Sequence, residues 1–187
     1  LADKYRYNPV LDMLHTTAWD RVRRFPKLLD ILRIDPGSFY ALLFRKWLIQ
    51  CIALAHNSAN YQEAAEGVLV IQGPQGIGKT TLFRKLAVRS DWLAEGVTLD
   101  MKNKDYIIQA VGVWIAELGE LESTLKKEQA SLKAFITQKM DRIRAPYARE
   151  ATDRPRRTSF GATVNQEAFL RDETGARRFW VVPVEDM

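Results

Sequence analysis

The pattern of apolar and polar positions divides the chain into two parts. From Asn8 to about Ala65, apolar residues recur every three to four positions, which predicts helices and no strong strand. From Gly67 onward, short apolar runs alternate with helix-compatible segments, which is typical of a parallel sheet with crossover helices. We therefore expect an all-helical segment over residues 1–66 and an α/β core over residues 67–187.

Turn and cap residues mark helix boundaries in the first part. Ser38 follows a chain break at residues 35–37 (Asp-Pro-Gly) and is expected to cap a helix with a broad apolar face. Asn60 has Glu63 three residues later, and this pair predicts a capping box on a short last helix.

Apolar runs in the second part predict the strands of the sheet. Two short segments, at residues 92–93 and 97–99, are ambiguous. The polar-rich segment over residues 118–140 favours two helices with a break at Ser131, and residues 142–157, rich in arginine, predict a loop or hairpin. The four expected strands are Val68–Ile71, Val111–Ala116, Thr158–Val164 and Arg178–Val182.

The segment after the first expected strand has the composition of a phosphate-binding loop. It has the spacing Gly, four residues, Gly-Lys-Thr, between an apolar strand and a helix start. Its glycines let successive backbone N–H groups converge on phosphate oxygens, and a helix N-terminus attracts the same anion. Lys79 is expected to reach the β- and γ-phosphates, and the Thr80 hydroxyl to ligate Mg²⁺. The predicted nucleotide contacts are Gly73, Pro74, Gln75, Gly76, Ile77, Gly78, Lys79, Thr80 and Thr81.

Strand ends supply the candidate catalytic groups. Glu117 ends an apolar run and is expected at the carboxyl edge of the sheet, beside the Mg²⁺. Glu120 follows three residues later, and either acid could bind the metal while the other polarises water. We favour Glu117 for the metal, whereas Glu120 fits a solvent-facing helix position equally well. Asn165 ends the third expected strand, where its amide suits a γ-phosphate and an attacking water, although asparagine is also common in turns.

The charge balance and the few cysteines and histidines limit the partners and metal sites that can be expected. The chain of 187 residues has 28 Lys and Arg against 23 Asp and Glu, a formal charge of +5, which suits a polyanionic partner without requiring one. Cys51 is the single cysteine, so the sequence holds no disulfide framework and no cysteine-based metal site, and we expect Cys51 to pack as a small apolar group. His15 and His56 are isolated in the sequence, and structural or surface roles are expected for both.

The sequence has neither an apolar run long enough to cross a bilayer nor a signal-peptide layout at its N-terminus. We therefore expect a cytoplasmic protein of a bacterial host, with no membrane partner. The chain begins at Leu1 and stops at Met187, so we expect a piece of a larger polypeptide whose core is truncated at the C-terminus.

Several independent motifs together resemble the virulence-associated E (VapE/VirE) domain of phages, plasmids and pathogenicity islands. The similarity covers nearly the whole chain. The motifs that carry it are Asn8-Pro-Val-Leu-Asp-Met-Leu14 with Trp19-Asp20, the loop Gln72–Thr81, Val113-Trp-Ile-Ala-Glu-Leu-Gly-Glu120, Arg144-Ala-Pro-Tyr147 and Phe169-Leu-Arg-Asp-Glu-Thr-Gly-Ala-Arg-Arg-Phe-Trp180.

This resemblance implies an AAA+-like phosphate-loop ATPase core related to superfamily 3 helicases, which assemble as rings. Glu117 would then be the Walker B acid and Asn165 the sensor of motif C, with ATP and Mg²⁺ as cofactors. Arg177 and Arg178 would include an arginine finger offered to a neighbouring subunit, although either could instead pair with Asp172, Glu173 or Glu185. The nucleic-acid contacts implied are Lys139, Arg142, Arg144, Tyr147 and Arg149, although a basic segment is often simply solvated.

The function that fits best is an ATP-dependent DNA helicase or translocase in replication of a phage or mobile element. Its partners would be single-stranded or forked DNA and, in the full-length protein, other copies in a homo-oligomeric ring, expected to be a hexamer. Two alternatives stay open. One is a small-molecule kinase of the phosphate-loop type, and the other is an ATP-gated DNA-binding or regulatory module that does not unwind DNA.

Overall fold

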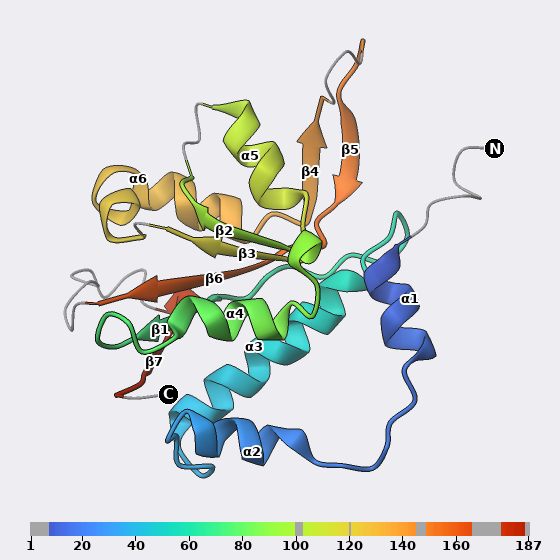
Figure 1. Cartoon of the computed structure of the whole chain (residues 1–187). Coiled ribbons are helices and arrows are strands. Elements are labelled where there is room, and N and C mark those ends of the chain that lie inside the picture. Colours follow the sequence, from blue (N-terminus) through green and yellow to red (C-terminus); the bar gives the residue numbers. More distant parts are fainter. Residues whose placement is uncertain (1–7, 100–102, 120, 145–148, 166–176, 186–187) are drawn as a thin grey trace.

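The structure of the protein is a computed structural model (Figure 1) that describes residues 8–99, 103–119, 121–144, 149–165 and 177–185, without the side chains of residues 122–129. Its elements, in chain order, are α1 (Pro9–Thr16), α2 (Arg24–Ile31), α3 (Phe39–Ala55), β1 (Val68–Gln72), α4 (Lys79–Leu86), η2 (Ser90–Trp92), β2 (Leu93–Val97), α5 (Lys104–Val111), β3 (Ile115–Leu118), α6 (Leu121–Ile136), β4 (Met140–Ile143), β5 (Thr152–Pro155), β6 (Ser159–Val164) and β7 (Phe179–Pro183).

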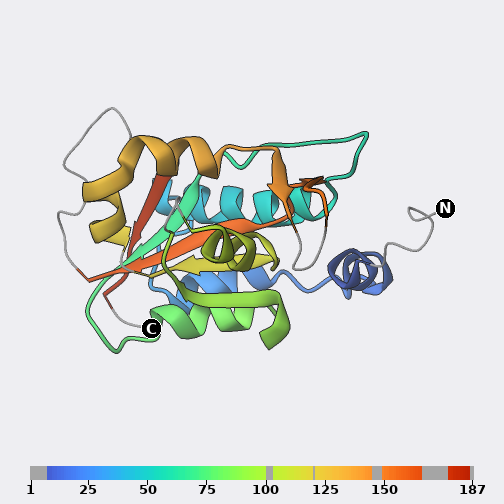
Figure 2. The same cartoon turned by 90° about the horizontal axis from the view of Figure 1, so that it is seen from above.

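Five parallel strands form the central sheet, in the order β2-β3-β6-β1-β7. Helices α5 and α6 cover one face, and α3 and α4, with α2 beneath them, cover the other (Figure 1). Seen from above, the hairpin of β4 and β5 lies toward the end of the molecule where α1 lies, away from the turn between β1 and α4 (Figure 2). The expected fold class, a parallel α/β core preceded by helices, is confirmed.

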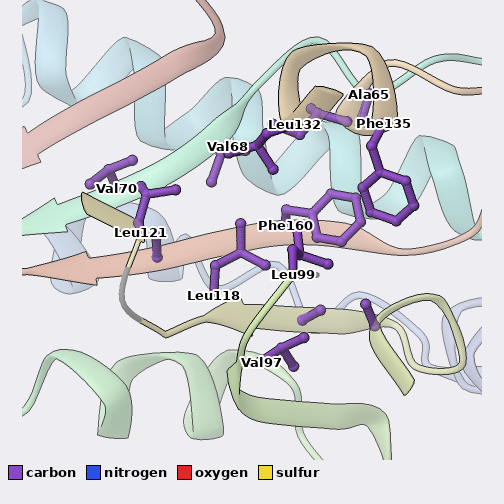
Figure 3. Packing of buried hydrophobic residues seen from close by; sticks show 14 of the residues in the cluster. Ala65, Val68, Val70, Val97, Leu99, Leu118, Leu121, Leu132, Phe135 and Phe160 are labelled. Atoms are coloured by element: carbon purple, nitrogen blue, oxygen red, sulfur yellow. The ribbon is translucent and has the colours of Figure 1, made fainter. Parts of the chain in front are cut away.

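Alternation along the strands fills both faces of the sheet. On one face, Leu132 and Phe135 of α6 pack over Phe160 and Val68 (Figure 3). On the other face, Trp47 of α3 lies fully buried among apolar side chains of β1 and α4, and its indole N–H donates to the Phe160 carbonyl oxygen at 2.7 Å. The helical N-terminal part therefore shares a core with the sheet, and the domain boundary near residue 66 stays a prediction.

The first, third and fourth expected strands are confirmed as β1, β6 and β7. The second begins later than expected, because α5 continues through Val111 and ends at Gly112, so that β3 covers only Ile115–Leu118. The edge strand β2 (Leu93–Val97) overlaps both ambiguous segments and pairs with β3. Pairing with neighbouring strands set these boundaries, and such pairing cannot be read from the local sequence pattern.

Two expected helix features are wrong. Residues 57–67 form no helix, because the Asn57 side chain accepts from the Glu63 N–H at 2.8 Å and donates to the Glu63 carbonyl at 2.9 Å, closing a loop instead. Ser131 does not break the next segment, since α6 is continuous over Leu121–Ile136. Burial of Leu132, Phe135 and Ile136 against the sheet outweighs the weak helix propensity of one serine.

The N-terminal cap and the cysteine behave as expected. The Ser38 hydroxyl accepts from the Ala41 N–H at 3.2 Å and starts α3. Cys51 is buried, and burial raises the pKa of its thiol to about 12, so it packs as a neutral group. Among the helices of the described residues, none is long and apolar enough to cross a membrane.

The arginine-rich segment was expected to form a loop or a hairpin, and it forms an antiparallel hairpin of β4 and β5. One of its arginines is buried. Arg156, just after β5, is fully buried and forms a two-point ion pair with the buried Asp141 of β4. Its guanidinium lies 4.4 Å from the ring centre of Phe135 and 5.3 Å from that of Phe160. This pair fixes the base of the hairpin to α6 and β6.

Replacing Asp141 with asparagine should strongly destabilise the fold. The change leaves the Arg156 charge buried without its partner, and loss of one member of a buried ion pair typically lowers the free energy of unfolding by about 3–5 kcal/mol. Urea unfolding followed by circular dichroism measures this. The matched control is Asp153→Asn on the exposed part of the same hairpin, expected within about 0.5 kcal/mol of wild type. Equal effects of the two changes would contradict the assigned role.

Candidate nucleotide-binding site

The candidate loop joins the carboxyl end of β1, an inner strand of the sheet, to the start of α4. Gly78, with φ of 98°, stands at the N-cap position of α4, and Gly76, with φ of 87°, also adopts the left-handed conformation. The N–H of Gly73 donates to the Val164 carbonyl oxygen at 3.1 Å, which ties the start of the loop to the end of β6. These conformations are the ones that let backbone N–H groups gather around an anion.

Lys79 is the first residue of α4, and its side chain turns back into the loop. Its ammonium group donates to the carbonyl oxygens of Gly73 at 2.7 Å and Pro74 at 2.6 Å, and to the Asn165 amide oxygen at 2.8 Å. Burial lowers the pKa of Lys79 from its ordinary value. Thr80 follows in the first turn of α4 and is half-buried. The structure therefore joins two predicted site residues, Lys79 and Asn165, that lie 86 positions apart.

Glu117 lies at the carboxyl edge of the sheet on β3, where only 4% of its surface is exposed. One carboxylate oxygen accepts from the backbone N–H of Gly96 at 2.8 Å, and the other accepts from the Thr163 hydroxyl at 2.8 Å. A carboxylate offers about four acceptor positions, and contacts with the described residues use two of them. The carboxylate is thus oriented from both sides by neighbouring strands.

The Gly96 N–H reaches Glu117 because β2 is irregular at this point. The register between β2 and β3 shifts between Ala94 and Val97, and Gly96 has a φ of 62°. A bulge of this kind re-aims backbone groups. Arg84 of α4 donates two hydrogen bonds of 2.6 Å to the carboxylate of Glu95, which anchors the bulge to the helix that follows the loop.

Sequence reasoning missed Gly96 and Thr163 as supports of Glu117. A glycine inside the run Leu-Ala-Glu-Gly-Val of β2 was an available signal, because such a glycine often marks a bulge. Thr163 gave no local signal. It lies on the strand that pairs with β3, and only the sheet order shows that it reaches Glu117.

Arg177 and Arg178 form a short turn that leads into β7, at the opposite edge of the sheet from the loop. Phe179 pairs with Val68 at the start of β1, so the length of a five-residue strand, about 16 Å, separates this turn from the loop. The loop of their own chain therefore lies beyond the reach of these arginines. Pairing with Glu185 is wrong, because Glu185 follows the other end of β7; Asp172 and Glu173 lie outside the described residues.

The predicted nucleic-acid residues map to the hairpin. Arg142 is exposed on β4, opposite Asp153, and Arg144 and Arg149 are exposed on the two sides of its tip. Lys139 lies at the hairpin base, where its ammonium group donates to the Gln62 carbonyl oxygen at 3.4 Å. Two predicted site residues, Glu120 and Tyr147, lie outside the described residues. The roles of the whole set stay predictions.

Three solved structures align with this fold, and one of them is a helicase. The structure aligns with two apo structures of the NrS-1 C-terminal region with TM-scores of 0.64, at 19% and 20% identity, covering 97% and 98% of this chain and 42% of each of those. It aligns with an inhibitor-bound JCV helicase with a TM-score of 0.51 at 11% identity, covering all of this chain and 52% of that one. At these identities the likeness concerns the fold alone. The chain spans about half or less of the length of these proteins.

A family model assigns the chain more narrowly. The virulence-associated protein E-like domain matches residues 14–187, nearly the whole sequence, and the chain therefore belongs to this family. The expected resemblance is confirmed. A search of curated proteins finds no match.

Removing the Thr163 hydroxyl should misorient Glu117 without disturbing the loop. Thr163→Val keeps the shape of the side chain and removes one of the two hydrogen bonds to the carboxylate, so nucleotide affinity should stay unchanged. Loss of an orienting partner typically lowers activity about 10–100-fold, and we expect a fall of this size in the rate constant of nucleotide hydrolysis. Single-turnover hydrolysis and equilibrium binding separate the two quantities. Thr163→Ser keeps the hydroxyl and is the control. If Thr163→Ser hydrolysed nucleotide as slowly as Thr163→Val, the assigned role would be contradicted.

Proposed function

We propose that this chain is the ATP-hydrolysing motor part of a DNA helicase or translocase of a phage or mobile element. The observation that carries the proposal is the meeting of three groups at one sheet edge. Lys79 touches Asn165 directly, and Glu117 stands on β3, two strand spacings of about 4.8 Å each from β1, which leads into the loop. Membership of the family and the helicase-type fold agree with this proposal.

The chemistry proposed is in-line attack of water on the γ-phosphorus, which breaks its bond to the β–γ bridging oxygen and releases ADP, inorganic phosphate and a proton. The loop N–H groups and Lys79 bind the β- and γ-phosphates, and the Asn165 amide hydrogen-bonds the γ-phosphate. The oxygen ligands of Thr80 and Glu117 suit Mg²⁺, which when bound supplies positive charge to the phosphates. Glu117, oriented by Gly96 and Thr163, holds either the metal or the attacking water.

DNA contact is proposed for the hairpin. Its exposed arginines, Arg142, Arg144 and Arg149, are suited to phosphates of a single strand. The hairpin is also connected to the nucleotide edge by a rigid element. Strand β6 starts just after the buried Arg156 at the hairpin base and leads to Asn165, about 20 Å away. This connection supports coupling between the γ-phosphate and the hairpin.

Assembly into a ring is also proposed for the full-length protein, and the position of the arginines supports it. Arg177 and Arg178 lie at the amino edge of the sheet, away from the loop of their own chain. A guanidinium that stabilises charge on the transferred phosphoryl group must therefore reach the loop of a neighbouring copy. We propose that one of the two arginines does so, with the nucleotide bound between subunits.

The activity test compares full-length wild type with Lys79→Ala and Glu117→Gln. Wild type should hydrolyse ATP with Mg²⁺ and turn over faster when single-stranded DNA is present. Lys79→Ala should bind ATP weakly, while Glu117→Gln should bind it normally and turn over at least about 100-fold more slowly, because the acid that orients the attack is lost. Steady-state phosphate release and filter binding measure both.

Three outcomes would contradict this proposal. Wild type without turnover, unchanged by Lys79→Ala, would show that the loop binds no functional triphosphate. Turnover that needs a small acceptor and ignores DNA would indicate a kinase instead. ATP-dependent DNA binding that survives Glu117→Gln, together with very slow turnover, would indicate a regulatory module.

The neighbouring-subunit role of the arginines has its own measurement. Mixing Arg177→Ala or Arg178→Ala chains with Lys79→Ala chains should restore turnover for the finger arginine, because a mixed interface can then combine an intact loop with an intact arginine. The other arginine variant serves as the control, since it should be close to wild type when assayed alone. Absence of restoration for both arginines would argue for a single-chain site.

A further inference from the structure

The two histidines of the chain meet on the surface, although 41 positions separate them. The Nε2 atoms of His15 and His56 are 3.3 Å apart, and both side chains are exposed. Both lie on the surface, as expected, but they are not isolated from one another in the fold. The proposed ATPase site uses neither residue, since α1 and the end of α3 lie at the other end of the molecule from the loop before α4 (Figure 1).

The hydrogen bonds around His56 define which of its nitrogens is available. Its Nδ1 atom lies 2.9 Å from the Ile52 carbonyl oxygen, which can only accept, so Nδ1 carries the proton. The Nε2 atom of the neutral ring then presents a lone pair toward His15. A backbone carbonyl bound to the far nitrogen is the usual partner that orients a histidine which binds a metal.

The position of the two rings also favours positive charge between them. His15 lies in the last turn of α1, and His56 is the C-cap residue of α3. The negative ends of two helix dipoles therefore converge on the same place, and each stabilises a nearby cation. Neither helix has an Asp or Glu in this turn or cap, so the favourable field comes from the backbone.

We propose that His15 and His56 bind one divalent transition-metal ion, of the Zn²⁺, Ni²⁺ or Cu²⁺ class. Two metal–nitrogen bonds of about 2.0–2.1 Å at a tetrahedral angle place the nitrogens about 3.3–3.4 Å apart, which is the spacing observed. Imidazole nitrogen suits these ions, whereas Mg²⁺ and Ca²⁺ prefer oxygen. No group of three or more His, Cys, Asp or Glu side chains is present among the described residues, so water completes the coordination.

The ion would join two helices that already touch at another point. The Asn8 amide donates to the Ala55 carbonyl oxygen at 3.3 Å, and Val10 and Ala55 share a small apolar cluster with Trp92. These contacts hold the two imidazoles close before a metal arrives, so little ordering is needed on binding. Binding then stabilises α1 on the end of α3, because the site exists only when the two are docked.

The test is calorimetric titration of Zn²⁺ into the protein, in excess Mg²⁺ so that oxygen sites are filled. Wild type should bind one Zn²⁺ per chain. His15→Gln and His56→Gln each remove a ligand and should weaken binding more than the roughly 10–100-fold that loss of an orienting partner causes. Hydrogen exchange gives a second readout, since Zn²⁺ should slow exchange in residues 9–16 of wild type and leave both variants unchanged.

Asp12→Asn is the matched control, because it removes an exposed charge from the same helix and leaves both imidazoles in place. It should bind Zn²⁺ with the affinity of wild type. A loss of affinity as large as that of the histidine variants would show that negative charge, not the imidazoles, attracts the ion, and would overturn the proposal. Absence of saturable binding in wild type would leave only a hydrogen bond between the rings and would also overturn it. Neither result depends on ATP hydrolysis.

Discussion

The candidate site depends on the pairing of β6 between β3 and β1. Because all three strands are parallel, their carboxyl ends reach the same edge of the sheet, and that edge collects the loop, Glu117 and Asn165. Close packing against α4 also constrains β6. Gly161 of β6 faces Phe83 of α4, and a Cβ atom there would lie 2.3 Å from the phenylalanine ring. The strand can therefore sit beneath the helix only without a side chain at this position.

The same strand gives the site its second property, which is that its groups are held before any ligand binds. Thr163 of β6 orients one oxygen of Glu117, and the bulge at Gly96 orients the other. Side chains fixed in this way need no rearrangement when charge develops on a bound group. Lys79 is not held for its ligand in the same way. Its ammonium group donates to two carbonyl oxygens of the loop, and a bound phosphate would compete with these oxygens for the ammonium group.

The hairpin is connected to this edge through buried charge rather than through apolar packing. Arg156 is fully buried and Asp141 is buried, and the two form an ion pair with the rings of Phe135 and Phe160 against the guanidinium. Such a pair adds little net stability compared with apolar residues, but it tolerates only one geometry. The exposed arginines of the hairpin are thereby carried on a base that is fixed to the core.

The amino-acid sequence alone determined the parallel α/β class, the loop from Gly73 to Thr81, and the strands that end near Glu117 and Asn165. These features are encoded locally, in apolar period, glycine spacing and cap residues. Tertiary structure decided which side chains meet: Asn165 with Lys79, Thr163 and Gly96 with Glu117, and His15 with His56. It also buried Arg156 and kept α6 continuous. These outcomes depend on strand order, register and helix docking, which are set by contacts between residues far apart in the chain and leave no mark on a local pattern.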